Sequence, residues 1–281
     1  MDSRTGKDVW AAGKLYEPYV GRWSRLVARG FLDWLAMPPG KDWLDVGCGT
    51  GALSQTLVER CGPASVTGVD PSAAFIEHAK AHVQGPVRFL VGDAQSLPLD
   101  AGCADAAVSG LVLNFVPKPQ VAVEEMARVV RPGGIVAAYV WDYAGRMELM
   151  RYFWDAAVEL DPAASALDEG LRFPLCRPAP LAELFAGTGL QRVDGREIEV
   201  PTRFRDFDDY WSPFLGGQGP APGYAMSLDE QRRAELRELI RSRLPVAADG
   251  SINLVARAWA VRGTVQRGES GIGAKHRSRT S

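Results

Sequence analysis

The sequence has no long hydrophobic run and no excess of either charge. Its longest apolar stretches are about ten residues, roughly half of what a membrane-spanning helix needs. The N-terminal stretch MDSRTGKDVWAAGKLYEP lacks the apolar core of a secretory signal. Lys and Arg total 32 against 34 Asp and Glu, whereas nucleic-acid-binding proteins normally show a strong basic excess. We therefore expect a cytoplasmic protein with no membrane partner and no nucleic-acid partner.

Cysteine and histidine are also scarce. The cysteines are widely spaced, with no CxxC pair, which indicates free thiols in a reducing compartment. They are Cys48, Cys61, Cys103 and Cys176. His78 and His82 lie four residues apart on a predicted helix, a spacing that suits a metal ion, but no third ligand is indicated. A solvated helix face explains the pair more simply, so we predict no metal site.

The residues that are present favour a packed α/β fold. Hydrophobic residues make up 46% of the chain, and short apolar runs alternate with helical patterns. Strands are predicted at 42–46, 65–69, 87–91, 104–109, 135–141, 191–200 and 252–261. Helices are predicted at 23–35, 53–59, 73–82, 121–130, 180–186 and 228–243. This order predicts a doubly wound, Rossmann-like sheet of seven strands, the last antiparallel, with helical lid insertions.

Two aromatic-rich stretches, 142–177 and 201–250, interrupt the alternation, and the second contains the turn sequence GGQGPAPG. Both follow the carboxyl ends of strands, where doubly wound sheets bind their ligands. We therefore expect them to cover the site as lids and to supply an apolar substrate pocket, unless their aromatic side chains simply fill the core. The candidate lining residues are Tyr143, Tyr152, Trp154, Tyr210, Trp211 and Phe214.

The chain is expected to divide into three parts. Residues 1–36 form an N-terminal lid or helical segment, and residues 37–263 form the main domain with both insertions. Residues 264–281 are rich in Gly, Ser and Arg, and we expect a disordered tail there.

A glycine-rich loop joins the first predicted strand of the sheet to a helix. Gly47, Gly49 and Ala52 fit the pattern GxGxx(G/A), and Asp70 ends the next strand about 20 residues later. Such a loop lets the backbone approach a ligand, and the acid is placed to bind ribose hydroxyls. The pattern predicts a ligand that contains a nucleoside, although a tight turn without a ligand is the simpler alternative.

Asp45 favours one kind of nucleoside ligand. A carboxylate two residues before the first glycine would repel a diphosphate unless it is neutralised, and it would attract an ammonium group. S-adenosyl-L-methionine (SAM) has an adenosine, a sulfonium and an ammonium group but no phosphate. Asp45 would act on it directly or by fixing the loop.

Residues 43–141 resemble class I SAM-dependent methyltransferases, particularly the ubiquinone/menaquinone-biosynthesis-like group. Five segments carry the resemblance, in the same order and at similar spacing. They are Trp43–Gly51 (WLDVGCGTG), Val69–Ser72 (VDPS), Gly92–Ala94 (GDA), Leu97–Leu99 (LPL) and Arg128–Gly134 (RVVRPGG). The resemblance implies a methyltransferase domain within residues 37–263, with SAM as cofactor and S-adenosyl-L-homocysteine as its product.

The resemblance also implies which residues bind the cofactor. The glycine loop would line the methionine part and the ribose of the cofactor. One Asp-Pro pair would contact the ribose and the adenine, and one Asp-Ala pair would contact the adenine. One turn would lie beside the reactive methyl group. In chain order these are Gly47, Cys48, Gly49 and Gly51; Asp70 and Pro71; Asp93 and Ala94; Ser109, Gly110 and Leu111. Either acid alternatively caps a helix or a turn.

The segment YEPYVGRWS precedes the first predicted helix, and in similar proteins this region folds over the cofactor. Arg22 would then meet the methionine carboxylate, with Trp23 beside it; a surface arginine next to core aromatics is the alternative. Asp142 and Tyr143, just beyond the strand at 135–141, are the best-placed proton acceptors.

The predicted reaction is methyl transfer by in-line displacement to a small, partly apolar or aromatic molecule. Two alternatives remain: an NAD-dependent oxidoreductase, and a SAM-binding protein without methyl transfer, such as a cyclase or a regulator. The sequence is compatible with a monomer or a homodimer.

Overall fold

The computed structural model describes residues 22–216 and 219–266, and its centre is one sheet of seven strands in the order β3-β2-β1-β4-β5-β7-β6. The strands are β1 (Asp42–Val46), β2 (Ser65–Asp70), β3 (Val87–Val91), β4 (Ala104–Gly110), β5 (Val130–Trp141), β6 (Gln191–Phe204) and β7 (Ile252–Thr264). Strands β1 to β5 pair in parallel, whereas β7 is antiparallel to both β5 and β6. The predicted fold class, with its antiparallel last strand, is confirmed.

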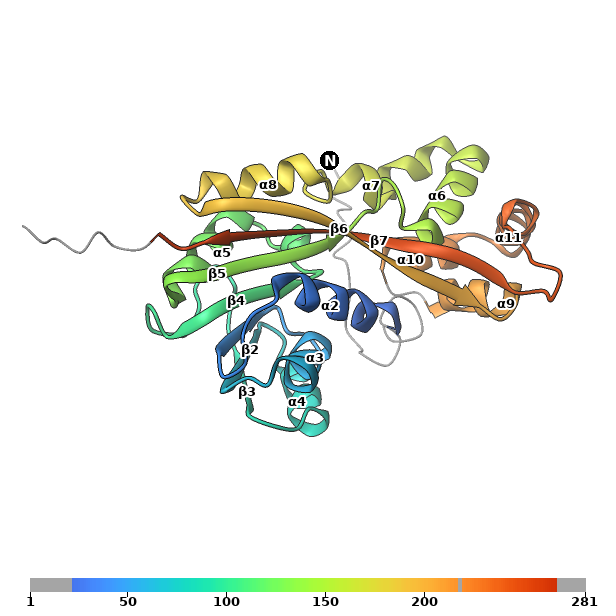
Figure 1. The fold of residues 1–281 in the computed structure, drawn as a ribbon. Helices are drawn as coiled ribbons and strands as arrows, with labels where there is room; N and C mark the ends of the chain where they lie inside the picture. The colour runs from blue at the N-terminus through green and yellow to red at the C-terminus, as the bar shows by residue number, and fades with distance from the viewer. Residues whose placement is uncertain (1–21, 217–218, 267–281) are drawn as a thin grey trace, which may run out of the picture.

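Helices cover both faces of the sheet (Figure 1). One face carries α2 (Arg22–Leu35), α3 (Ala52–Cys61) and α4 (Ala73–His82), and the other carries α5 (Pro119–Val129) and α8 (Pro178–Gly187). Strand β1 is buried from its second residue onward, as expected where parallel strands are covered on both sides. This layering leaves the carboxyl ends of the parallel strands as the place for a ligand.

The two insertions gather beyond the end of β5, around the far part of the long β6–β7 hairpin (Figure 1). Their helices are α6 (Glu148–Leu160), α7 (Glu169–Arg172), α9 (Phe207–Trp211), α10 (Pro220–Ser227) and α11 (Glu230–Arg243). Short 3₁₀ helices lie at Pro162–Leu167 and Ser212–Gly216. Helix α11 packs on α6, so the two insertions form one helical unit beside the hairpin.

Aromatic side chains fill the interior of this helical unit. Phe153 stacks on Phe214 with ring centroids 4.5 Å apart, and the hydroxyl of Tyr210 donates a hydrogen bond to the carbonyl of Leu149 at 2.9 Å. Trp154, Tyr210, Trp211 and Phe214 are buried, and Tyr152 packs against the same core. The sequence left open whether these five residues line a substrate pocket or fill the core, and the structure has them in the core of the helical unit.

Among the described residues, no helix combines the length and the apolar character needed to cross a membrane.

Candidate cofactor and acceptor site

A cavity of about 570 Å³ lies where β1, β2, β4 and β5 end. Its volume is within the range of about 300–1,000 Å³ that is typical of ligand pockets. Asp45, Asp70 and Asp93 contribute to its lining, and none of the described lining residues is Lys or Arg. The cavity therefore suits a ligand that carries positive charge, and it suits a phosphate poorly.

The glycine loop between β1 and α3 forms one wall of the cavity. Gly47 and Gly49 both have positive φ, +74° and +52°, a conformation that side-chain-bearing residues rarely adopt. A Cβ atom on Gly47 would lie 2.5 Å from Cγ1 of Val112, whereas one on Gly49 would meet no atom within 4 Å. Glycine at position 47 thus permits close packing, and glycine at position 49 leaves open space beside the loop.

Asp70, the last residue of β2, holds this loop in place. Its carboxylate accepts a hydrogen bond from the backbone N–H of Gly49 at 3.0 Å and another from that of Ser72 at 2.9 Å. Burial raises the pKa of Asp70, and the two backbone hydrogen bonds oppose that rise. Because an ionised carboxylate has about four acceptor sites, about two remain for a ligand.

Asp45 is buried beneath the loop, and half of its carboxylate is paired. Its Oδ2 accepts a hydrogen bond from the hydroxyl of Ser54 at 2.7 Å, but its Oδ1 has no partner among the described residues. Burial raises the pKa of Asp45 to about 7, the Ser54 hydrogen bond lowers it, and the nearby charge of Asp70 adds to the rise. A buried acceptor without a donor is uncommon in folded proteins, so this oxygen is suited to a ligand N–H group.

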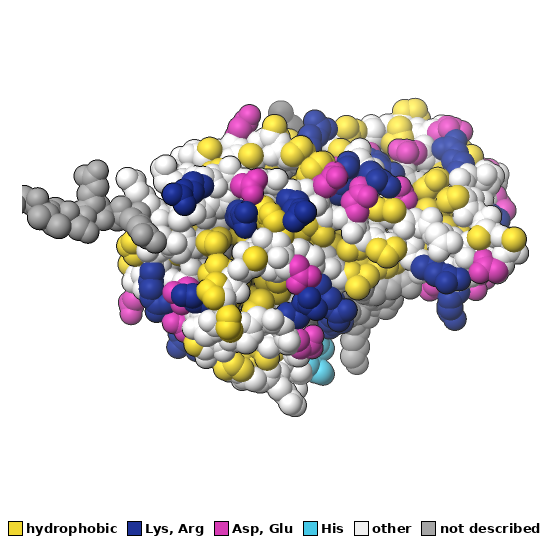
Figure 2. Space-filling view, in the orientation of Figure 1, with side chains coloured by type: hydrophobic (Ala, Val, Ile, Leu, Met, Phe, Trp, Pro, Cys, Tyr) yellow, Lys and Arg dark blue, Asp and Glu magenta, His cyan; other side chains and the backbone are white. Residues whose placement is uncertain are grey.

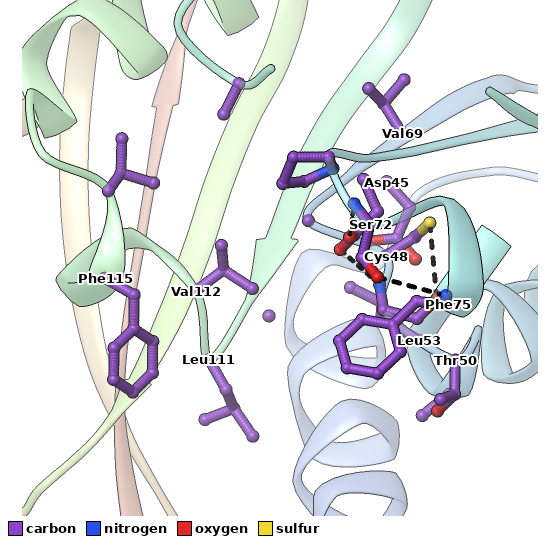
Figure 3. A pocket seen from close by; sticks show the side chains of 18 of the residues that line it. Asp45, Cys48, Thr50, Leu53, Val69, Ser72, Phe75, Leu111, Val112 and Phe115 are labelled. Carbon is purple, nitrogen blue, oxygen red and sulfur yellow. Dashed lines mark hydrogen bonds between the residues drawn. The ribbon is translucent and has the colours of Figure 1, made fainter. Parts of the chain in front are cut away.

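The opposite side of the cavity is apolar. Figure 3 shows Leu111, Val112 and Phe115 facing Asp45 and Cys48 of the glycine-loop side. Leu111 has a φ of +64°, which is uncommon for a residue with a side chain, and its N–H donates to the carbonyl of Tyr139 at 2.8 Å. Further apolar and aromatic lining residues are Val116, Pro117, Tyr139, Trp141 and Tyr143.

Most residues expected at the cofactor line this cavity. They are Asp45, Gly47, Cys48, Gly49, Asp70, Pro71, Asp93, Ala94, Gly110 and Leu111. Asp93 is exposed, and its carboxylate accepts a hydrogen bond from the N–H of Gln95 at 2.8 Å, so it also shapes its own turn.

Three expected cofactor residues, Gly51, Ser109 and Trp23, are not among the described lining residues. Gly51 and Ser109 are each adjacent in the sequence to a residue that lines the cavity, and Ser109 is buried in β4. Trp23 packs edge-to-face against Phe204 of β6 with ring centroids 5.1 Å apart, and its neighbour Ser24 lines the cavity instead. The side chain of Arg22 lies outside the described part of the structure.

Asp142 and Tyr143, the predicted proton acceptors, have different positions. Asp142 does not line the cavity; its Oδ2 accepts hydrogen bonds from the backbone N–H of Arg146 and from Nε of Arg257, each at 2.8 Å. Because Arg257 also forms an ion pair with this carboxylate, Asp142 joins β5 to β7 rather than facing a substrate. Tyr143 lines the cavity.

The sequence interpretation missed several lining residues, including Ser24, Phe75, Val112, Tyr139 and Trp141. Alternation along the strand was the available signal. Tyr139, Trp141 and Tyr143 are spaced two apart, and side chains at that spacing in a strand share one face.

No group of three or more potential metal-binding side chains (His, Cys, Asp or Glu) occurs within 22–216 and 219–266. His78 and His82 stack with ring centroids 4.0 Å apart on the exposed side of α4.

A protein-family model described as a methyltransferase domain matches residues 44–138. The chain is 31% identical over 187 residues to the 2-methyl-6-phytyl-1,4-hydroquinone methyltransferase of Synechocystis sp., covering 65% of this chain and 57% of that protein. It is 31% identical over 152 residues to the demethylmenaquinone methyltransferase of Desulfitobacterium hafniense, covering 43% of this chain and 60% of that protein. The chain thus spans less than two thirds of the length of these curated relatives.

A solved structure from Anabaena variabilis, described as a methyltransferase from an antibiotic biosynthesis pathway, has the same fold. Its TM-score is 0.59 at 21% identity, and the match covers 84% of this chain and 96% of that one.

The fold, the glycine-loop site and the family match define a class I SAM-dependent methyltransferase domain, whose cofactor is SAM. Within this class, the domain is similar to the ubiquinone/menaquinone-biosynthesis-like group. Both the resemblance seen in the sequence and its cofactor are confirmed.

Proposed function

We propose that this protein transfers a methyl group from SAM to a small, apolar, ring-bearing acceptor. The observation that carries the proposal is the division of the cavity into two chemically different sides. The glycine-loop side presents carboxylates, and the other side presents aliphatic and aromatic side chains. A charged cofactor and an apolar acceptor are the two ligands that such a division suits.

The residues of the glycine-loop side fit the cofactor. The unpaired Oδ1 of Asp45 is suited to its ammonium group, and the remaining acceptor sites of Asp70 are suited to its ribose hydroxyls. The open space beside Gly49 leaves room for the ligand to approach the backbone. When bound, the cofactor supplies an electrophilic methyl group on a positively charged sulfur.

The residues of the apolar side would position the acceptor. Phe115, Trp141 and Tyr143 offer flat apolar surfaces that stack on a ring and exclude water from the reacting atoms. Holding the two reactants in line supplies most of the rate enhancement in a displacement of this kind. We assign to Tyr143, which lines the cavity, the role of relaying a proton from an acceptor hydroxyl, because Asp142 is held by Arg257.

The lining also weighs against an NAD-dependent oxidoreductase. A dinucleotide brings a diphosphate to the glycine loop, where Asp45 would repel it and no lysine or arginine among the described lining residues would neutralise it. The relatives that act on quinones support a ring-bearing acceptor for this protein.

The proposal is tested by incubating the purified protein with SAM deuterated in its methyl group and a bacterial metabolite extract. Mass spectrometry should detect at least one ring-bearing product that carries the deuterated methyl group, and none with the Asp70→Ala variant. Cofactor binding without transfer to any molecule would contradict the proposal and favour a SAM-binding protein without methyl transfer. Transfer to a charged, non-ring molecule would contradict the proposed acceptor class.

A further inference from the structure

Trp141, the last residue of β5, has a buried indole N–H without an acceptor. Its side chain is 2% exposed and lines the cavity, and its Nε1 has no hydrogen-bond partner among the described residues. An indole nitrogen only donates hydrogen bonds, and leaving such a donor unpaired in the interior is unfavourable. A ligand atom that accepts a hydrogen bond would remove this cost.

The strand register places Trp141 on the acceptor side of the cavity. In the β4–β5 pair, Gly110 lies opposite Tyr139, so Trp141 stands two residues beyond the last residue of β4. The chain leaves β4 through Leu111 and Val112, which form part of the apolar side. Strand β4 separates β5 from β1, the strand that leads into the glycine loop. The indole N–H is therefore associated with the apolar side and not with the carboxylates of the cofactor side.

We infer that Trp141 is a specificity-determining residue, whose indole N–H donates a hydrogen bond to an oxygen of a planar, apolar acceptor. The inference rests on the proposed function and narrows its substrate class to rings that carry a carbonyl or similar oxygen. Phe115 and Tyr143 supply apolar contacts that any ring of suitable size satisfies. The single buried donor distinguishes oxygen-bearing rings from hydrocarbons, because only the former can pair it.

Trp43 offers a matched control for this residue. It lies in β1, is also 2% exposed, and its Nε1 likewise lacks a hydrogen-bond partner among the described residues, but it does not line the cavity. Trp141→Phe removes one buried indole N–H from the end of β5, and Trp43→Phe removes one from near the start of β1. Only the substitution at position 141 should change ligand selectivity.

The test uses two probes of the same shape, 2-acetylnaphthalene and 2-isopropenylnaphthalene, which differ by a C=O in place of a C=CH₂ group. Each is titrated by calorimetry into protein saturated with S-adenosyl-L-homocysteine. The wild type should bind the ketone about tenfold more tightly than the alkene, the ratio expected for one buried hydrogen bond. Trp141→Phe should lose this preference, and Trp43→Phe should keep it.

A second measurement is independent of the stability of the variants. In ¹⁵N-labelled wild-type protein, the ketone should move one indole N–H resonance downfield, namely the resonance that is missing from Trp141→Phe, and the alkene should not. The inference is overturned if the preference persists in Trp141→Phe, if the resonance does not respond to the ketone, or if neither probe binds. Failure to bind S-adenosyl-L-homocysteine would instead overturn the proposed function itself.

Discussion

The backbone N–H of Gly49 donates a hydrogen bond to the carboxylate of Asp70 at 3.0 Å, across 21 positions of the sequence. This bond ties the glycine loop after β1 to the end of β2, so the two sequence features that indicate a nucleoside ligand form one unit. The bond thus helps to hold the loop in its positive-φ conformation.

Substituting Gly49 by alanine should weaken cofactor binding beyond its effect on folding. Gly49 and Gly40 both have positive φ, and in both an added Cβ atom would meet nothing within 4 Å. Gly40→Ala is therefore a matched control for backbone strain, and each variant should lose about 1 kcal/mol of unfolding free energy. Calorimetry should show at least a tenfold loss of S-adenosyl-L-homocysteine affinity for Gly49→Ala only. Equal affinities would contradict the placement of the ligand at Gly49.

Cofactor affinity should rise with pH around neutrality because of Asp45. Burial raises the pKa of this carboxyl to about 7, so it is largely protonated below that pH, and an ammonium group binds its ionised form better. The affinity for S-adenosyl-L-homocysteine, measured from pH 6 to pH 8 by calorimetry, should increase, and Asp45→Asn should flatten the dependence. A wild-type affinity independent of pH would show that the ammonium group binds elsewhere.

The ligand-free protein should lose stability as pH rises from about 4.5 to 8, because of Glu169 in the helical unit. Its carboxylate accepts a hydrogen bond from Nε1 of Trp154, and burial raises its pKa to about 8. In this range the unfolded chain binds fewer protons at that position than the native protein, so the free energy of unfolding decreases with pH. Urea denaturation of Glu169→Gln should show a weaker decrease. A dependence as steep as that of the wild type would mean that Glu169 is ionised in the native protein.

Asp142→Asn should act on stability rather than on proton transfer. The ion pair between the buried Asp142 and the partly buried Arg257 joins β5 to β7, and losing a hydrogen bond to a charged group typically costs about 1.5–3 kcal/mol. The exposed pair between Asp194 and Arg262 is a control, and Asp194→Asn should cost less than about 1 kcal/mol. Both costs are measured by urea denaturation. If Asp142→Asn removed the acidic limb of the pH–rate profile while leaving stability unchanged, Asp142 would be the proton acceptor after all.

Local patterns in the sequence were sufficient to predict the sheet. The run from 42 to 46 is almost entirely apolar or buried, as predicted for a strand. The hydroxyl of Ser72 accepts a hydrogen bond from the N–H of Phe75, so α4 begins at the expected residue, Ala73. Strand β6 continues to Phe204, beyond the predicted end at residue 200, because the pairing with β7 continues to Ile252. That extension depends on a partner strand some 50 residues away, which no local pattern reports.

The cofactor side was more predictable than the acceptor side for the same reason. Gly47, Gly49 and Asp70 have roles that fix the residue type at each position, because each is needed for a backbone conformation or a charge. An aromatic residue does not reveal whether it packs in a core or lines a cavity. Tyr143 and Trp154 looked equivalent in the sequence, but only Tyr143 faces the cavity.

The surface view gives no sign of a charged docking face on the side that it shows. In Figure 2, basic and acidic side chains are interspersed over that face, in keeping with the nearly equal totals of the two in the sequence. The concentration of charge of one sign lies at the cavity, where three aspartates and no described lysine or arginine contribute to the lining.

The most direct test of the account is a calorimetric titration of S-adenosyl-L-homocysteine and of NAD⁺ into the wild type and into Asp70→Asn. Asparagine keeps the size of the side chain but loses the charge and one of the acceptor groups that hold the glycine loop and that we propose for the ribose. The account predicts that the wild type binds S-adenosyl-L-homocysteine and not NAD⁺, and that Asp70→Asn binds it at least tenfold more weakly. Tight binding of NAD⁺ without binding of S-adenosyl-L-homocysteine would contradict it.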